Sequence, residues 1–162
     1  MSTIEERNKN DERLLRAVEL CSRGDKDAKS YILDIDYAGR IFDDLIDKDY
    51  PVSDEQIAKA YFILLAKLWL NPFFIKYHRT LVPLHIASFT AFLDANKWIK
   101  DDNPVKKVFA CVMQDYLVEL YICVAFLVGG YEYMRSVSGE IRKILIEEIR
   151  SKDIEVLLRE GL

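Results

Sequence analysis

The sequence predicts an all-α fold, a bundle of five to seven helices, from three observations. Apolar residues recur at helical spacing through most of the chain, and no segment alternates as a strand would. Proline, glycine and capping residues fall where helices of ordinary length would begin and end. The 162 residues, 51% hydrophobic and 31% charged, fit a single globular domain over 1–162.

The first two expected helices end at residues that commonly stop helices. A helix over about 3–23 has a narrow apolar stripe, and Gly24 ends it. The stripe consists of Leu14, Leu15, Val18 and Cys21. A second helix, over about 26–48, stops before Tyr50-Pro51 because the residue before proline avoids helical angles.

The next two helices have clear start signals. Ser53 and Gln56 have the spacing of a capping box, which predicts a helix from there to about Leu70. Asn71-Pro72 combines a capping side chain with proline at the first helical position, so a fourth helix follows over about 72–100. Pro83 is expected to kink or divide that helix, because proline lacks a backbone donor.

The most apolar helix is expected over about 104–135, after Asn103-Pro104 repeats the same start signal. It is apolar almost all round, which is typical of a helix at the centre of a bundle. Gly129-Gly130 predicts close approach of another helix or a kink. A break is expected over 136–139, and one or two amphipathic helices then close the chain over 140–160.

Two acids, Asp115 and Glu119, lie four residues apart in this apolar helix. That spacing places both carboxylates on one helix face. Burying an unpaired carboxylate is costly, so the pair needs a cation, a metal or a raised pKa. One interpretation is a buried salt bridge to another helix, for which the candidate cations are Arg40, Lys67, Arg79 and Arg135. The alternatives are a metal or acid–base site and exposure at an oligomer interface.

The second helix is rich in aspartate. Asp36, Asp43 and Asp47 share a narrow arc next to Arg40, which indicates either a solvated face or a carboxylate cluster for Mg²⁺. Asp34 falls instead within the apolar arc, and we expect it to be the buried partner of an arginine or lysine.

The stretch Asp43-Asp44-Leu45-Ile46-Asp47 resembles the aspartate-rich motif of all-helical isoprenoid diphosphate synthases. Gln114-Asp115-Tyr116-Leu117-Val118-Glu119 is similar to the second aspartate-rich helix of the squalene and phytoene synthase type, although Glu119 stands where that family has Asp. The resemblance covers about eleven residues of 162. It implies that Asp43, Asp47, Asp115 and Glu119 would be ligands of Mg²⁺ ions that bind a diphosphate.

An apolar helix junction gives a candidate interaction patch. Helix junctions normally lie at the surface, yet this one reads Trp-Leu-Asn-Pro-Phe-Phe, which predicts either a buried corner or a docking surface. The patch would consist of Trp69, Phe73, Phe74 and Tyr77.

Other features limit the classes of function and location. Net charge is −4 without a basic stripe, so we expect no nucleic-acid binding. The N-terminus is too charged for a signal peptide and the uncharged runs are too short to span a bilayer. Three cysteines without metal-ligand spacing fit reduced thiols in a cytoplasmic protein.

Two functions follow from these observations. The first is a non-catalytic binding, regulatory or assembly protein without a cofactor, which binds a protein partner or self-associates. It is favoured because the chain has no P-loop, nucleophile elbow or dinucleotide-binding motif. The alternative is a Mg²⁺-dependent enzyme for a phosphorylated or diphosphate substrate, with carboxylates facing each other from two helices.

Overall fold

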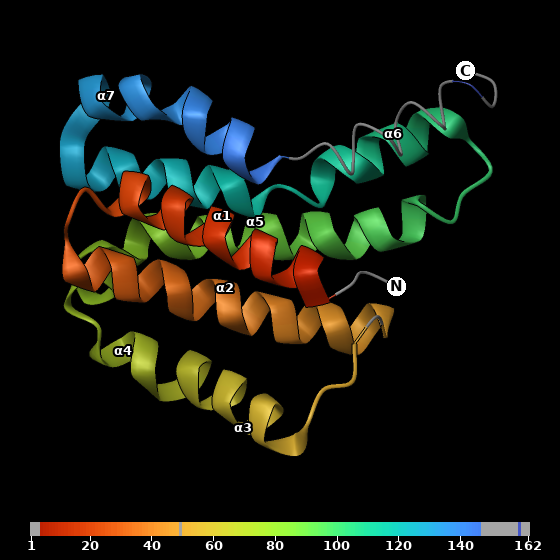
Figure 1. Cartoon of the computed structure of the whole chain (residues 1–162), viewed down its shortest axis with the longest axis horizontal. Helices are drawn as coiled ribbons and strands as arrows, with labels where there is room; N and C mark the ends of the chain where they lie inside the picture. Colours follow the sequence, from red (N-terminus) through yellow and green to blue (C-terminus); the bar gives the residue numbers. More distant parts are fainter. Residues whose placement is uncertain (1–3, 49, 147–158, 160–162) are drawn as a thin grey trace. The chain divides into compact units, whose positions relative to one another are not determined.

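The computed structural model describes residues 4–48, 50–146 and 159, and every regular element in these ranges is a helix (Figure 1). The α-helices are α1 (Ile4–Ser22), α2 (Lys26–Asp47), α3 (Asp54–Phe62), α4 (Leu68–Leu70), α5 (Pro72–Trp98), α6 (Pro104–Met113) and α7 (Leu117–Leu145). One π-helix, η1 (Ile63–Lys67), joins α3 to α4. The predicted all-α bundle of five to seven helices is confirmed, since the described chain has seven α-helices and no strand.

The chain divides into two compact units, residues 1–78 and 79–162, and the boundary falls inside α5. The first unit contains α1 to α4 and the start of α5, and the second contains the rest of α5 with α6 and α7. The single domain expected over 1–162 stays a prediction.

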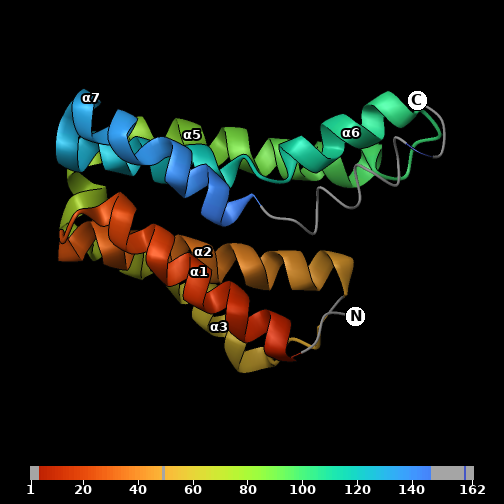
Figure 2. The same cartoon turned by 45° about the horizontal axis from the view of Figure 1, so that its top comes forward.

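A tight turn joins α1 to α2 in the first unit. Arg23 and Gly24 take positive φ angles of 50° and 83°, which ends α1 where the glycine predicted its end. Asp25 then caps α2, because its Oδ1 accepts hydrogen bonds from the backbone N–H groups of Asp27 and Ala28, each at 2.9 Å. The two helices pack side by side (Figures 1 and 2). Of the predicted stripe on α1, Leu15 alone is exposed.

The third expected helix is present but is not α-helical throughout. Its capping box is confirmed: Ser53 Oγ accepts from the Gln56 N–H at 3.3 Å, and Gln56 Oε1 accepts from the Ser53 N–H at 2.9 Å. Residues 63–67 widen into the π-helix, in which the Leu68 N–H donates to the Ile63 carbonyl. The chain then turns sharply at Asn71 into α5.

Pro83 does not divide α5, so that part of the expectation is wrong, while the kink expected as the alternative stays a prediction. The helix is continuous from Pro72 to Trp98. Pro83 is exposed, so the backbone carbonyl that loses its N–H partner can be hydrated instead.

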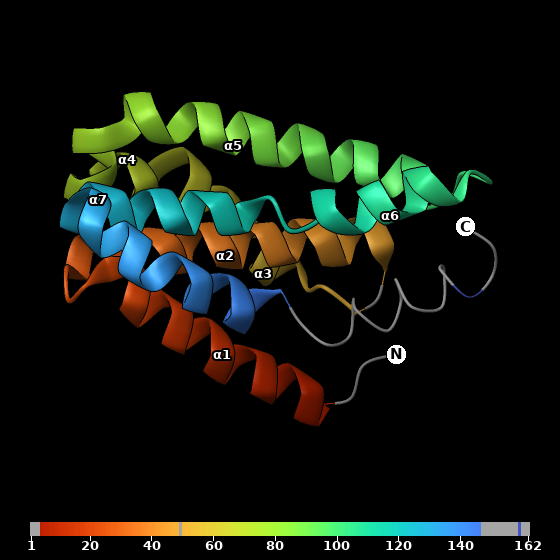
Figure 3. The same ribbon diagram turned by 90° about the horizontal axis from the view of Figure 1, so that it is seen from above.

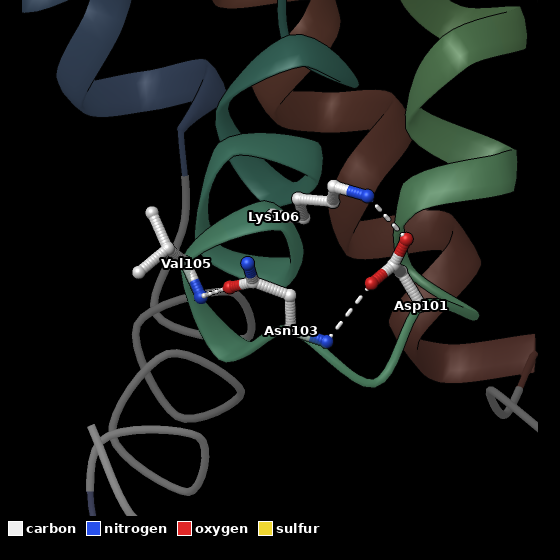
Figure 4. Close-up of polar contacts among 4 residues, drawn as sticks. All are labelled: Asp101, Asn103, Val105 and Lys106. Atoms are coloured by element: carbon white, nitrogen blue, oxygen red, sulfur yellow. Dashed lines mark hydrogen bonds and ion pairs between the residues drawn. The ribbon is translucent and has the colours of Figure 1, made fainter.

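The start of α6 confirms the second Asn-Pro signal (Figure 4). The Asn103 side chain accepts from the Val105 N–H at 2.9 Å, with Pro104 at the first helical position. Asp101 stabilises this turn, because its carboxylate accepts hydrogen bonds from Lys106 Nζ at 2.6 Å and from the Asn103 N–H at 2.9 Å. These two bonds hold the pKa of Asp101 below its usual value.

The apolar stretch expected as one helix over 104–135 has two interruptions. A tight turn of i→i+3 hydrogen bonds separates α6 from α7 at residues 114–116. Within α7, Gly130 takes φ 75° and ψ −174°, and the helix doubles back on itself there (Figures 1 and 3). The kink expected at Gly129-Gly130 is confirmed, whereas the break expected over 136–139 is wrong. Of the helices expected over 140–160, the part from 147 onward, except residue 159, lies outside the described residues.

By length and composition, one helical stretch in the described chain, 104–145, could cross a membrane. Of the 18 residues that form its most apolar part, 39% are buried. The bent pair formed by 54–70 and 72–98 passes the same test when taken together. Core helices of soluble proteins pass this test as well. Because Gly130 folds α7 back, neither straight half of α7 has the about 20 residues that a span needs.

Candidate functional site

An apolar surface of the first unit lies on one side of the continuous helix formed by α3, η1 and α4. We call it the outer face, and it consists of Ile57, Tyr61, Phe62, Leu64, Leu65, Trp69 and Leu70, all of them exposed. Figure 2 shows α3 beside α2, with which α3 and η1 are in contact. The helix therefore has a packed side and an apolar side that faces solvent.

The packed side is formed by small and aliphatic residues. Ala60, Ile63 and Leu68 are buried, and Ala60 joins a cluster with Ala38 and Ile41 of α2. In a helix with only one apolar stripe, all the apolar residues would lie on this packed side. Here the opposite side is apolar too, so burial against α2 leaves the outer face uncovered.

The outer face is comparable in area to the largest apolar patches of monomers. Tyr61, Phe62 and Trp69 are 65%, 59% and 54% exposed. With about 150–250 Å² for each complete aromatic side chain, these three alone expose roughly 350 Å². The four aliphatic members enlarge a patch that already lies in the range of the largest on typical monomers, about 300–600 Å².

The corner at Asn71 determines where the predicted patch residues lie. The Asn71 side chain donates to the Asp27 carbonyl at 2.9 Å and accepts from the Phe74 N–H at 3.0 Å. Phe73 and Phe74 are 4% and 2% exposed, so both belong to the core, while Tyr77 is half-buried.

Trp69 is the predicted patch residue that belongs to the outer face, and its ring packs edge-on against Phe74 at 5.2 Å. Its neighbours Tyr61, Phe62 and Leu65 were not singled out from the sequence. The available signal was the stretch 60–70, which is apolar except for Lys67. On a helix such a stretch places apolar residues on every side, and a single neighbouring helix can bury only one side.

A charged pair lies at the edge of the packed side. Asp34 of α2 is 6% exposed, and its Oδ1 accepts from Lys67 Nζ at 2.6 Å. Lys67 is the last residue of η1 and its side chain is 48% exposed. The expectation that Asp34 is a buried partner of an arginine or lysine is confirmed.

The acids predicted as metal ligands are divided between the two units. Asp43 and Asp47 are exposed on α2, whereas Asp115 lies in the turn before α7 and Glu119 in its first turn. Across the residues that the structure describes, no group of three or more His, Cys, Asp or Glu side chains could hold a metal ion. The Mg²⁺ alternative stays a prediction.

Glu119 has a partner that the sequence did not indicate. Arg142, in the second half of α7, donates from Nη2 to both carboxylate oxygens at 2.8 and 2.9 Å. The reversal at Gly130 brings these residues together although they are 23 positions apart. A salt bridge was expected at Glu119, but none of the candidate cations forms it and the Glu119 side chain is 51% exposed.

We expect Glu119→Gln to lower the free energy of unfolding only slightly, by about 0.5–1 kcal/mol, because water screens a half-exposed ion pair. Chemical denaturation at low and high salt measures it, and the loss should shrink at high salt. Arg142→Met, alone and combined with Glu119→Gln, completes a double-mutant cycle. A coupling energy above about 3 kcal/mol would contradict the exposed geometry and indicate a desolvated pair.

The cysteines lie among apolar side chains. Cys21 and Cys111 are buried and Cys123 is half-buried, and none of the three is in a disulfide. Burial raises the pKa of the Cys21 thiol to about 12, which makes it a poor nucleophile near neutral pH.

Comparisons with known proteins found no match: no family model, no curated protein and no solved structure is similar to this chain. The resemblance to isoprenoid diphosphate synthases accordingly rests on its two short motifs alone.

Proposed function

We propose that this chain is a non-catalytic binding or assembly protein that self-associates through the outer face. The observation that carries the proposal is that the helix over 54–70 packs one side on α2 and exposes an equally apolar opposite side. The largest exposed apolar patch of a monomer is often functional, and larger patches mark interaction sites. The free thiols fit a reducing compartment such as the cytoplasm.

A second copy of the chain is the occupant that the outer face favours. Seventeen helical residues over 54–70 extend about 25 Å, so two copies could bury this apolar side against each other along its length. Two-fold dimers, the commonest homo-oligomers, pair a patch with itself, so one apolar helix face supplies both sides of the interface. Tyr61 and Trp69 are of the residue types enriched at such contacts.

The charges at the start of the helix bear on the kind of partner. Exposed Asp54 and Glu55 begin it. The same acids, in a chain of net charge −4, disfavour the alternative of an anionic lipid surface.

Leu65→Glu is the variant that tests self-association, because Leu65 lies in the middle of the outer face and is 59% exposed. We expect the wild type to show concentration-dependent association by sedimentation velocity. The variant should associate more than tenfold more weakly, because dimerisation would bury its carboxylate. Leu15→Glu is the matched control, since Leu15 is 48% exposed on α1, and this variant should associate like the wild type.

A wild type that stays monomeric across the concentration series overturns the proposal. Flotation with anionic vesicles gives a second readout on the same proteins. A monomeric wild type that binds vesicles, with binding lost in Leu65→Glu, would assign the outer face to a lipid surface and reject self-association.

A further inference from the structure

The helix over 54–70 is apolar on both sides, so hydrophobicity alone does not determine which side packs on α2. Ala60, Ile63 and Leu68 are buried against the rest of the unit, while Tyr61, Leu64 and Leu65 are just as apolar and are exposed. Hydrophobic burial alone would accept several rotations of this helix about its axis. A more specific interaction than apolar burial can then select the observed rotation.

The π-helix changes which residues share the packed side. The Leu68 N–H donates to the Ile63 carbonyl, so these two residues lie one turn apart on the same side of the helix. Leu68 and Ile63 are 3% and 2% exposed. In a regular α-helix, the residues three and four positions after Ile63 would lie on its side, and these are Ala66 and Lys67. The π turn therefore keeps Leu68 in the core and moves Lys67 to its edge.

Lys67 is also where the segment is tied to α2 by an ion pair. Asp34 is buried, its Oδ1 accepts from Lys67 Nζ at 2.6 Å, and its Oδ2 has no hydrogen-bond partner in the described chain. A buried carboxylate with one cation is costly to separate from it, so any rotation that removes Lys67 is penalised. The contact of Lys59 Nζ with the Tyr37 ring, at 4.3 Å from the centroid, is weaker and farther from the π turn.

We propose that Asp34 and Lys67 are positioning residues: their ion pair holds residues 63–67 in the π turn and fixes which side of the 54–70 helix faces outward. Trp69 and Leu70 follow the π turn, and the turn places them on the outer face. Tyr61, before the turn, and Leu65, within it, lie on the same face. The pair sets the geometry of the self-association surface without belonging to it. This inference rests on the proposed self-association.

The test removes both charges together, in Asp34→Leu/Lys67→Leu. Replacing both residues leaves no buried carboxylate without a cation, so the double variant should fold with an unfolding midpoint close to that of the wild type. We expect its self-association to be at least roughly tenfold weaker. Hydrogen exchange of the Leu68 amide should become faster, because its bond to Ile63 would no longer be held.

Controls separate positioning from a general structural effect. Lys67→Arg retains the cation and should keep both the wild-type association and the protection of the Leu68 amide. A double variant that associates like the wild type with unchanged Leu68 protection overturns the inference. If the wild type itself stays monomeric, the proposed function fails, and the Leu68 exchange rate still decides whether the pair holds the π turn. Should the double variant unfold, the single variant Asp34→Asn, measured by the same exchange rate, takes its place with the same criteria.

Discussion

Replacing Phe74 by alanine is expected to lower the free energy of unfolding by about 3–5 kcal/mol, the range for truncating a buried phenylalanine. Phe74 is 2% exposed, its ring stacks on Tyr31 with centroids 5.8 Å apart, and Trp69 packs on it edge-on at 5.2 Å. Truncation leaves a cavity that the rings of Tyr31 and Trp69 cannot close. Chemical denaturation followed by circular dichroism measures the change.

Ile75→Ala is the matched control for Phe74→Ala. Ile75 is the next residue in α5 and is 51% exposed, so its truncation should cost less than about 1 kcal/mol. A small effect of Phe74→Ala, similar to that of Ile75→Ala, would mean that Phe74 lies at the surface. That result would return it to the interaction patch that the sequence predicted.

Gly130→Ala is expected to destabilise the protein by about 1–3 kcal/mol or more, because it forces an L-residue into a conformation that only glycine readily adopts. Gly130 has φ 75° and ψ −174°, and it is the point at which α7 reverses. A Cβ added at Gly130 would meet no atom within 4 Å. The loss would therefore come from the backbone rather than from a clash.

Gly139→Ala provides the opposite expectation in the same helix. Gly139 is exposed, lies in the helical second half of α7 and also has open space around an added Cβ. Alanine should stabilise this position by about 0.5–1 kcal/mol, because it is the better helix former. Thermal or chemical unfolding of both variants measures the contrast. Equal effects at the two positions would contradict the reversal at Gly130.

The helix starts were predictable because their signals are local. Ser53 with Gln56, and Asn103 with Pro104, satisfy backbone groups within three residues of themselves, so the sequence alone specifies them. The turn at Gly24 is specified in the same way, by a residue that accepts positive φ. The break at 136–139 was misplaced because Ser136 and Gly139 are tolerated inside a helix once neighbouring residues pack. Ser136 Oγ, for example, donates to the Tyr133 carbonyl at 2.7 Å.

The candidate site was predictable only in part. The apolar composition around Trp69 indicated either a core or a surface, and the structure gives both: Phe74 is buried, and Trp69 belongs to the outer face. The π turn could not be predicted from the sequence, because it depends on contacts with distant residues. Ile63 and Leu68 pack in the core, and Lys67 pairs with Asp34 of α2.

The sequence by itself determined that this chain is helical, where most of its helices begin, and that Asp34 needs a cation. Helical periodicity and end-capping depend on residues a few positions apart, and a buried carboxylate requires compensation whatever its surroundings. Only the tertiary structure decided that Lys67 supplies that cation and that Arg142 pairs with Glu119. It also decided which side of the 54–70 helix is exposed, because that helix is apolar on both sides and its rotation depends on contacts with distant residues.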